Sequence, residues 1–548
     1  MTRLLLLAAL AAPLFAQGGR GGAPNREAPV KPVPFERLLR SSQEPQNWLT
    51  YNGNLNSQRH SVLTQINPAN ARDLTLAWVF QGRSLEKHEI TPIVADGVMY
   101  TASSPNDVFA LDAATGKTIW QYSHKPEDGV RTPWKLTRGL AILGDKLFLA
   151  ALDAKLIALD AKTGKELWNT RIADHKLQYS LTVAPIVVKD KVIIGPAGGE
   201  YGIRGFLAAY DASTGKEVWR FNTVPGPGEP GYDTWLGKDG KPNDSYLHGG
   251  APIWTTGSYD PQTNLTFWGT GNPGPDYNGD NRNGDNLYSS SVIALDADTG
   301  KLKWHYQFSP HDEFDWDSTQ TPVLADITFK GASRKVMMWA NRNGVFYVLD
   351  RTTGEFLSGK PFIKTNWVNG FDEKGRPIRA PGTVSTPEGV LIYPGNQGGT
   401  NWYPPSFSPT TGLFYIPAWE NSSATYRRGE LLEFKEGGGF MGQGPGRGGS
   451  DEVFSSIIAM DPATSERKWT FRLGAPSTES GVLTTASNVL FAGGRDGQFV
   501  ALDARDGKLL WETNLGPSVS AGPMSYSVNG KQYVSIQCGP SLYTFTLR

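Results

Sequence analysis

A short phrase recurs seven times along the chain and limits what the chain can fold into. In each copy an apolar run ends in Asp, a tight turn that usually contains Gly follows, and a Trp usually comes next. The copies span 109–120, 157–168, 208–219, 293–304, 347–356, 458–469 and 500–511. Successive Asp positions are 48, 51, 85, 54, 111 and 42 residues apart. Repeats of about 40–50 residues indicate a propeller or a solenoid.

Each copy is predicted to form two strands joined by a turn. The Asp can bond to the backbone of its own turn, and Gly adopts the positive φ that such a turn needs. The Trp on the second strand supplies a large apolar plate for packing. One such unit cannot bury both of its faces, so the units must stack side by side.

The predicted fold class is all-β, an eight-bladed β-propeller formed by residues 45–548. Seven blades are visible as repeats, and the eighth is expected to combine residues 76–80 with the C-terminal strand 541–548. This pairing of the two ends would close the ring and remove exposed strand edges. An open β-solenoid is the alternative. The two longest gaps exceed one blade each, so additional loops or strands are expected there.

The beginning of the chain has the features of an exported protein. Residues 1–16 contain Arg3, an apolar run and the small residue Ala16, as in a secretory signal peptide. The run is too short to span a bilayer, and no later segment is apolar enough to do so. The sequence therefore predicts a periplasmic or secreted protein. Residues 17–44 are expected to form a flexible leader, and the Gly-rich residues 437–449 an exposed loop.

Composition excludes several classes of function. The 53 basic and 53 acidic residues balance, so a nucleic-acid partner is not expected. The single cysteine, Cys538, allows no internal disulfide and no CxxCH haem motif, and we expect it in the core. Short matches to phosphate-loop and zinc motifs fail at Leu111 and Pro92, which occupy required positions.

The segment HDEFDWDSTQ (311–320) concentrates acidic side chains beside aromatic ones. In an extended segment Asp315 and Asp317 point to one side, while Phe314 and Trp316 point to the other. Two carboxylates this close raise each other's pKa unless a cation lies between them. The segment is therefore either a solvated turn with aromatic anchors or a carboxylate pair that faces a cation in the funnel of the ring.

The repeat A-x-D-x-x-(T/D)-G-x-x-x-W resembles the tryptophan-docking motif of pyrroloquinoline quinone (PQQ) dehydrogenases of the methanol and ethanol dehydrogenase type. The resemblance covers roughly residues 45–548. It implies an eight-bladed propeller that oxidises a primary alcohol, or a related hydroxyl substrate, to the aldehyde. It also implies hydride transfer to C5 of PQQ and electron transfer to a separate carrier, expected to be a soluble cytochrome c.

Short motifs extend the resemblance to single residues. The implied cofactor contacts are Glu89 (KHEITP), Arg138 (LTRGLA), Thr182 (SLTVAP), Gly198 and Gly199 (GPAGGE), Trp254 (GGAPIW), Arg342 (NRNG), and Asn401 and Trp402 (GGTNW). The implied metal ligands are Glu200, Asn272, Asp315 and Asp317, with Asp315 also the catalytic base. These residue types suit the ligands, because a flat tricarboxylate quinone needs aromatic plates and cations, and a hard metal needs oxygen.

The metal implied by the resemblance is one Ca²⁺ or lanthanide ion. An additional Asp two residues after the catalytic Asp accompanies lanthanide use in similar enzymes, so Asp317 favours a lanthanide. Some similar sugar dehydrogenases carry a D-x-D with calcium or magnesium, and a PQQ sugar dehydrogenase remains an alternative function.

Three departures from the family pattern leave a second alternative open. Thr132-Pro133 replaces a pair of cysteines, Glu479 replaces a Trp, and Ala197 begins the segment that is Ser-Gly-Ala in the family. The alternative is a propeller that holds no quinone and acts as a binding or outer-membrane assembly scaffold.

Overall fold

The computed structural model describes residues 26–548, apart from residues 133 and 432. The predicted signal peptide (1–16) and the first part of the predicted leader (17–25) lie outside the described residues. Among the residues described, no helix has the length and apolar character needed to span a membrane.

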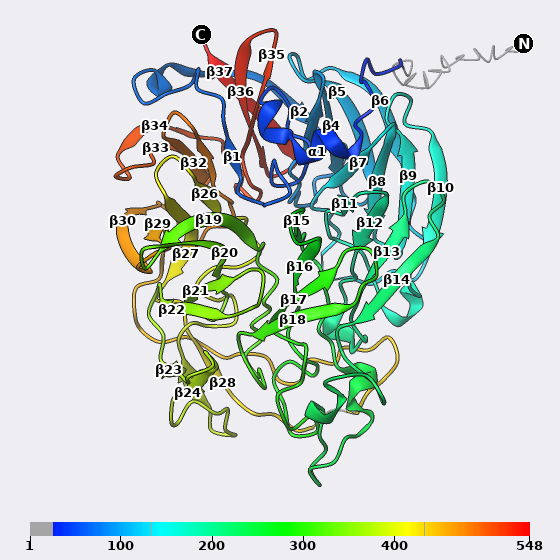
Figure 1. Cartoon of the computed structure of the whole chain (residues 1–548), viewed down its shortest axis with the longest axis vertical. Coiled ribbons are helices and arrows are strands. Elements are labelled where there is room, and N and C mark those ends of the chain that lie inside the picture. Colours follow the sequence, from blue (N-terminus) through cyan, green and yellow to red (C-terminus); the bar gives the residue numbers. More distant parts are fainter. Residues whose placement is uncertain (1–25, 133, 432) are drawn as a thin grey trace, which may run out of the picture.

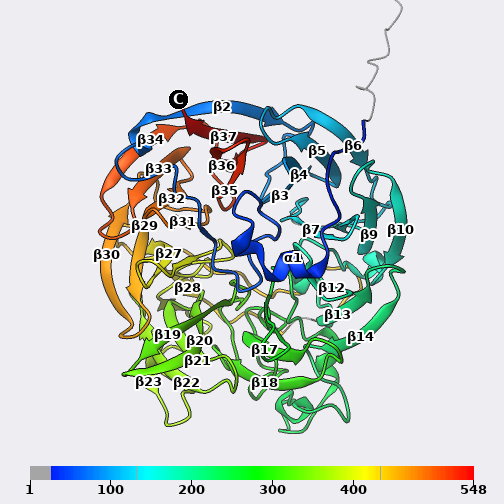
Figure 2. The same ribbon diagram turned by 45° about the horizontal axis from the view of Figure 1, so that its top comes forward.

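Eight blades of four antiparallel strands each, one of them extended by the short parallel strand β1 (His60–Ser61), surround a central axis, which confirms the predicted eight-bladed propeller (Figures 1 and 2). The first four blades are β3 (Ile93–Ala95), β4 (Val98–Ser103), β5 (Asp107–Asp112), β6 (Thr118–Ser123); β7 (Leu140–Leu143), β8 (Lys146–Ala151), β9 (Lys155–Asp160), β10 (Glu166–Arg171); β11 (Ile186–Val188), β12 (Lys191–Ile194), β13 (Phe206–Asp211), β14 (Glu217–Asn222); and β15 (Ser258–Asp260), β16 (Leu265–Gly269), β17 (Ser291–Asp296), β18 (Leu302–Gln307).

The remaining blades follow the same order from the inner to the outer strand, except that the last one ends on β2. They are β19 (Val323–Phe329), β20 (Ala332–Ala340), β21 (Val345–Asp350), β22 (Phe356–Pro361); β26 (Ser406–Ser408), β27 (Leu413–Glu420), β29 (Phe454–Asp461), β30 (Glu466–Arg472); β31 (Leu483–Thr485), β32 (Val489–Gly493), β33 (Gln498–Asp503), β34 (Leu509–Asn514); and β35 (Met524–Val528), β36 (Lys531–Cys538), β37 (Ser541–Leu547), β2 (Leu74–Gln81).

The two ends of the chain close the ring as predicted. Strand β2 pairs antiparallel with β37, from Leu74 opposite Leu547 to Gln81 opposite Ser541. The N-terminal strand β2 therefore completes the blade whose other three strands come from the C-terminus, and the ring is closed. Cys538 ends the neighbouring β36 and is fully buried, as expected.

The tryptophan of one repeat lies against the turn of the next. Five indole Nε1 groups donate at 3.1–3.3 Å to the carbonyl after the repeat Asp of the neighbouring blade: Trp78 to Ala113, Trp120 to Ala161, Trp168 to Ala212, Trp219 to Ala297 and Trp469 to Ala504. The turn glycine lies directly on the ring. At Gly164 φ is +71°, and an added Cβ would lie 2.5 Å from Trp120. The turn thus requires Gly for both its conformation and its close contact.

A polar segment, residues 46–61, runs past the inner strands near α1 and is called the hub segment here. Its carbonyls accept from backbone N–H groups of four blades: Leu55 from Tyr259, Asn56 from Leu324, Gln58 from Phe407, and Arg59 from Thr484. Strand β1 (His60–Ser61) also pairs with β31. The Arg59 side chain is fully buried and donates to the Pro523 carbonyl at 2.6 Å. The segment therefore satisfies inner strand edges that would otherwise lack partners.

Part of the predicted flexible leader is packed against the ring. Residues 26–44 include α1 (Phe35–Leu39) and the 3₁₀ turn η1 (Ser41–Gln43). Val33 is fully buried and bridges to Gly144. Arg37 pairs with Glu44 at 2.6 Å and with Asp96 at 2.8 Å. The structure differs from the expectation because this stretch, although rich in Pro, offers apolar anchors and a guanidinium with two carboxylate partners.

The two longest gaps contain additional elements, as expected. The first holds the 3₁₀ turns η5 (Tyr232–Thr234) and η6 (Asp244–His248). The second holds two small ribbons: β23 (Val368–Phe371) with β24 (Pro377–Arg379), and β25 (Val390–Ile392) with β28 (Ala424–Tyr426). Two further 3₁₀ turns are η2 (Ala71–Asp73) and η3 (His175–Leu177).

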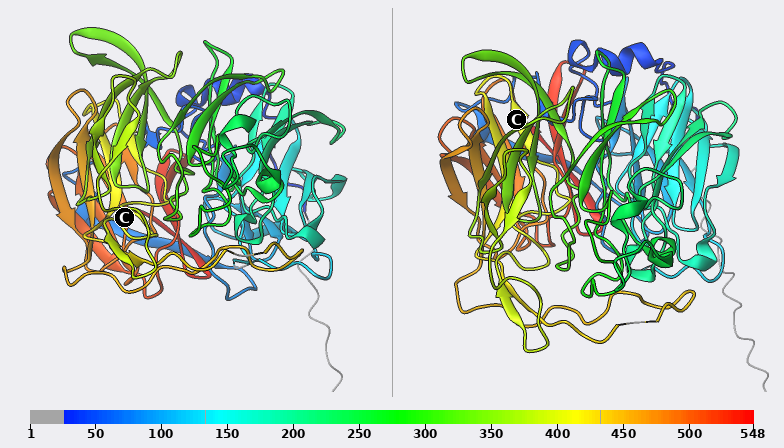
Figure 3. Two further views of the ribbon diagram at one scale, coloured as in Figure 1. Left: turned by 90° about the horizontal axis from the view of Figure 1, so that it is seen from below. Right: turned by 60° about the horizontal axis from the view of Figure 1, so that its bottom comes forward.

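Residues 427–431 and 433–453, called the crossing segment here, run over the face of the ring opposite α1 (Figure 3). Its Gly-rich part, 437–449, contains no helix or strand and is largely exposed, as expected. Phe440 is the exception: it is buried, and its backbone N–H donates to the Glu200 carbonyl at 2.7 Å. Aromatic contacts anchor this residue, because Phe434 stacks on His248 and Phe440 packs beside it.

Loss of one indole hydrogen bond should destabilise the ring. Trp469 and Trp304 are both half-buried and both lie on a turn glycine, but only Trp469 Nε1 has a partner among the described residues. We expect Trp469→Phe to lower the free energy of unfolding by about 1 kcal/mol more than the matched control Trp304→Phe. Chemical unfolding followed by circular dichroism measures the difference. Equal losses would contradict a role for the indole hydrogen bond.

Candidate functional site

The predicted site residues lie at one end of the hub for a topological reason. Six of them come just before the innermost strand of a blade: Glu89, Arg138, Thr182, Trp254, Asp317 and Trp402. Three come just after the second strand: Glu200, Asn272 and Arg342. Because neighbouring strands of an antiparallel sheet run in opposite directions, the start of the first strand and the end of the second lie at the same end of the blade. Six blades therefore contribute side chains to one place.

Arg138 lies close to two aromatic rings. Its guanidinium carbon is 4.6 Å from the centre of the Trp254 ring and 4.9 Å from that of Trp402. Its Nη1 donates to Thr182 Oγ1 at 2.9 Å and to the Trp254 carbonyl at 3.2 Å. The arrangement offers aromatic faces and a fixed cation, which suits a flat anionic molecule.

A chain of charges extends from Arg138 to Glu479. Glu89 pairs with Arg138 at 2.8 Å and with Lys87 at 2.8 Å, and Lys87 also pairs with Glu479 at 2.6 Å. Burial lowers the pKa of Lys87, but the two carboxylates outweigh burial and leave this pKa raised. Lys87 was missed in the sequence, although it stands two residues before Glu89. Its ammonium group compensates the negative charge that Glu479 brings near the aromatic rings.

Arg342 joins the two acids of segment 311–320. Its Nη1 lies 2.5 Å from Asp317 Oδ2, and its Nη2 lies 3.1 Å from Asp315 Oδ2. Both carboxylates thus face the same way, as predicted, and the cation between them is this guanidinium. Asp317 Oδ1 also accepts from the Asn272 backbone N–H at 3.1 Å.

The aromatic residues of the same segment face the core, as predicted. Phe314 and Trp316 are buried and contact each other with ring centres 4.6 Å apart. The segment is not a regular strand, because Asp315 has φ +59°. Asp312, a residue that sequence reasoning missed, holds this shape: its Oδ1 accepts from the N–H groups of Phe314 and Trp316, both at 3.1 Å.

Asp315 has the electrostatic environment of a proton acceptor. Burial raises its pKa to about 7, with Arg342 opposing the increase and Asp317 adding to it. Tyr277, another residue that the sequence did not single out, donates its hydroxyl to Asp315 Oδ2 at 3.0 Å. A carboxyl with a pKa near 7 can accept and release a proton at neutral pH.

The predicted metal ligands are near one another but are not a preformed cage. Burial raises the pKa of Glu200, and the negative charge of Asp317 adds to this. Within residues 26–548 as described, no three His, Cys, Asp or Glu side chains are gathered closely enough to hold a metal ion. Ion binding would require these side chains to approach one another. The donors themselves fit a hard cation, since all are oxygen atoms and their negative charge exceeds that of Arg342.

Asp276 is an acid of this cluster that sequence reasoning missed. It is 3% exposed, and its Oδ1 has no hydrogen-bond partner among the described residues. Its pKa is raised well above the ordinary value by burial and by the charges of Asp315 and Glu200. The only signal in the sequence was an acid four residues after Asn272.

The remaining predicted cofactor residues shape the backbone. Gly198 has φ +122°, and an added Cβ would lie 2.4 Å from the Gln178 carbonyl oxygen. Gly199 begins the 3₁₀ turn η4 (Gly199–Tyr201) that carries Glu200. Asn401 uses its side chain locally: Nδ2 donates to the Gln397 carbonyl, and Oδ1 accepts from the Trp402 N–H. These glycines and Asn401 thus fix the backbone beside the acids and the aromatic rings.

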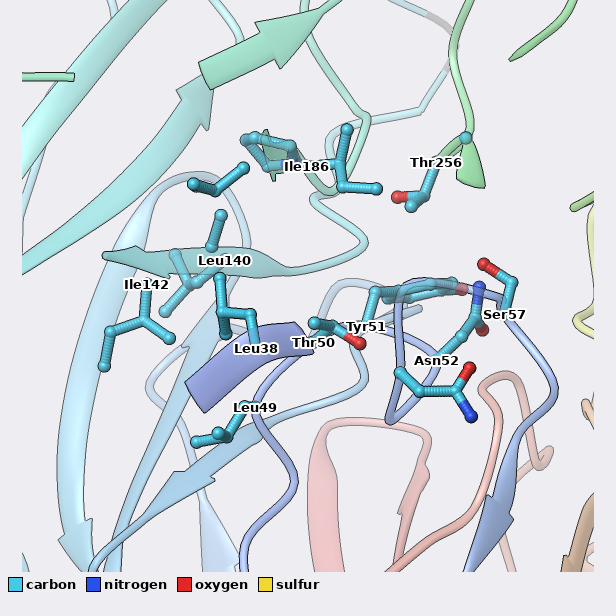
Figure 4. A pocket seen from close by; sticks show the side chains of 15 residues that line it. Leu38, Leu49, Thr50, Tyr51, Asn52, Ser57, Leu140, Ile142, Ile186 and Thr256 are labelled. Carbon is cyan, nitrogen blue, oxygen red and sulfur yellow. The ribbon is translucent and has the colours of Figure 1, made fainter. Parts of the chain in front are cut away.

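Two cavities lie away from this cluster. The one in Figure 4 lies between Leu38 of α1 and side chains such as Leu140 and Ile186, and its volume of about 20 Å³ holds little more than one water. A second, of about 410 Å³, is lined by Phe314, Trp316 and Arg379, on the side of segment 311–320 away from Asp315. Neither is lined by the predicted cofactor residues.

Comparison with known proteins gives a consistent result. The chain matches the PQQ glucose/ethanol/alcohol dehydrogenase β-propeller domain family over residues 48–359 and 471–534. It is 39% identical to a quinohemoprotein alcohol dehydrogenase of Comamonas testosteroni over 558 residues, which cover 97% of this chain and 78% of that protein. It is 36% identical to a lanthanide-dependent methanol dehydrogenase of Methylacidiphilum fumariolicum, covering 92% of this chain and 86% of the relative.

Solved structures agree with this result. The quinohemoprotein alcohol dehydrogenase ADHIIG of Pseudomonas putida HK5 superposes with a TM-score of 0.87 at 36% identity, covering 94% of this chain and 82% of that one. A europium-containing methanol dehydrogenase superposes with a TM-score of 0.85 at 33% identity, covering 93% and 100%. The chain therefore belongs to the family of PQQ-dependent quinoprotein alcohol dehydrogenases, oxidoreductases that act on CH–OH donors.

Proposed function

We propose that this enzyme oxidises a primary alcohol, or a related hydroxyl substrate, to the aldehyde, and that Asp315 is the general base. The environment of Asp315 is the main support: a half-buried carboxylate with a pKa of about 7, hydrogen-bonded by Tyr277 and paired with Arg342. A base with this pKa is ionised in about half of the molecules at neutral pH and is efficient in proton transfer.

The residues around Arg138 fit the quinone. The rings of Trp254 and Trp402 provide flat apolar faces, and the Arg138 guanidinium between them can pair with a carboxylate. Gly198 and Gly199 allow the turn before Glu200 to pack closely against Gln178 and Pro252. When bound, PQQ supplies the two-electron oxidant of the reaction.

The polypeptide controls the proton that leaves the substrate hydroxyl. Asp315 accepts this proton on its carboxylate. The Tyr277 hydroxyl and the Arg342 guanidinium hold that carboxylate in one orientation. Trp316 and Phe314 fill the core behind it, which fixes the backbone from which Asp315 projects.

We also propose that Glu200, Asn272, Asp315 and Asp317 hold one Ca²⁺ or lanthanide ion. All four offer oxygen, the atom that these hard cations prefer. A bound ion acts as a Lewis acid that polarises a carbonyl group. The second carboxylate, Asp317, favours a lanthanide because a trivalent ion gains more from an additional negative charge. The family includes a relative named as lanthanide-dependent.

Electrons are proposed to leave to a separate soluble cytochrome c in the periplasm. The sequence contains a single cysteine and therefore no CxxCH haem motif. A relative at 37% identity is named 1-butanol dehydrogenase (cytochrome c). Residues 1–16, as a signal peptide, would deliver the chain to that compartment.

Reconstitution tests the function. The purified protein is mixed with PQQ and either CaCl₂ or LaCl₃, and dye reduction is followed with methanol, ethanol and glucose. We expect turnover with an alcohol, and a loss of at least about 100-fold in kcat for Asp315→Asn with quinone absorbance retained. Turnover of glucose alone would indicate a sugar dehydrogenase. No uptake of quinone with either metal would indicate a binding or assembly scaffold.

Asp317 is expected to determine lanthanide use. Asp317→Ala removes one proposed carboxylate ligand, so we expect it to abolish turnover supported by LaCl₃ in the same dye assay. The control is Asp326→Ala, which removes an exposed acid of β19 that pairs with Arg351. Undiminished lanthanum-supported turnover in Asp317→Ala would refute the role of Asp317.

The raised pKa of Asp315 predicts a pH effect on stability. A carboxyl whose pKa is about 7 in the fold and about 4 when unfolded destabilises the fold increasingly as pH rises through that interval. Asp315→Asn removes this cost. In protein free of metal and quinone, we expect it to raise Tm more at pH 8 than at pH 5, relative to the exposed control Asp73→Asn. The same change in Tm at both pH values would contradict the shifted pKa.

A further inference from the structure

Asp276 is a buried acid without a counter-ion, and its position suggests a use. Its side chain is 3% exposed, its Oδ1 has no partner among the described residues, and no salt bridge reaches it there. A charged carboxylate is costly to bury without a counter-ion, and a bound cation would remove this cost.

The backbone that carries Asp276 is fixed between two site carboxylates. The Asn272 N–H donates to Asp317 Oδ1 at 3.1 Å, and the Tyr277 hydroxyl donates to Asp315 Oδ2 at 3.0 Å. The Tyr277 N–H donates to the carbonyl of Met441 in the crossing segment at 3.0 Å. Asp276 therefore lies on a stretch that contacts both acids of the proposed cation site.

Charge is unbalanced in this part of the funnel. The negative charges of three other acids, Glu200, Asp315 and Asp317, act on the carboxyl of Asp276. Arg342 is the one cation within salt-bridge distance of any of them in the described part of the chain. Like charges at short range repel unless a cation compensates them. A multivalent ion is the species that would neutralise the excess.

Resting on the proposed function, we propose that Asp276 supplies a further carboxylate to the cation site and increases its preference for a trivalent over a divalent ion. The energy between a carboxylate and an ion is proportional to the charge of the ion. The binding free energy that one more carboxylate adds is therefore about one and a half times as large for a trivalent ion as for a divalent one.

A purely structural role is the competing explanation. Arg282 is fully buried, which lowers its pKa, and the negative charges of nearby acids, among them Asp276, partly offset this effect. However, Arg282 bonds to neutral groups: the Asn286 side chain and the carbonyls of Pro275 and Asp312. If Asp276 served only as a distant counter-ion of Arg282, its removal would change stability and leave ion affinity alone.

Calorimetric titration separates these roles without measuring activity. The full chain is loaded with PQQ, freed of metal with a chelator, and titrated with LaCl₃ and with CaCl₂. If Asp276→Asn weakens Ca²⁺ binding about tenfold, we expect it to weaken La³⁺ binding about thirtyfold. The matched control is Asp280→Asn, in the same loop, whose half-exposed carboxylate pairs with Arg428. It should leave both affinities unchanged.

The outcomes distinguish this inference from the proposed function. Unchanged affinities in a folded Asp276→Asn protein would refute the role of Asp276 and leave the cation site standing. Equal weakening for both ions would refute the charge preference. Absence of ion binding in the unaltered protein would refute the cation site itself. If Asp276→Asn does not fold, Asp276→Ser removes the same charge with less bulk and gives the same comparison.

Discussion

Closure of the ring is the constraint on which the rest of this structure depends. The pairing of β2 with β37 joins the two ends of the ring, and the stacking of six Trp side chains on the turn glycine of the next blade sets the spacing between those blades. Once eight blades surround one axis, the starts of their first strands and the ends of their second strands must meet. Residues as far apart as Glu89 and Trp402 are neighbours for this reason. The hub segment further ties the inner strands together close to α1, and the crossing segment covers the opposite face.

Electrostatics then decides what this meeting place can do. Around Arg138 the positive charge lies between aromatic rings, while around Asp315 the negative charge exceeds what Arg342 can balance. The first environment suits a planar anion and the second a multivalent cation. The ammonium group of Lys87 compensates the negative charge of Glu479 near the aromatic rings. Burial raises the pKa of the Asp315 carboxyl to about 7, which is in the range where a general base is useful.

Much of this architecture could be predicted from the sequence, because the spacing of the repeats can be measured there and is typical of a propeller or a solenoid. The eighth blade followed from two strand-like segments at the ends of the ring, and the opposite faces of segment 311–320 followed from its alternation. Contacts between distant segments could not be predicted. The sequence does not single out Lys87, Asp276 and Tyr277, because the residues that they contact or affect are brought near them only by the fold. The same holds for residues 26–44, whose composition indicates flexibility but whose apolar side chains meet partners on the ring.

We propose that acidic side chains at one end of the hub hold an ion beside a planar quinone. Diffraction from crystals grown with PQQ and LaCl₃, with the anomalous signal of lanthanum recorded, tests this proposal most directly. We expect one strong anomalous peak bounded by oxygen atoms of Glu200, Asn272, Asp315 and Asp317, with the quinone stacked against Trp254. A peak elsewhere on the protein, or quinone density away from Trp254 and Arg138, would contradict it.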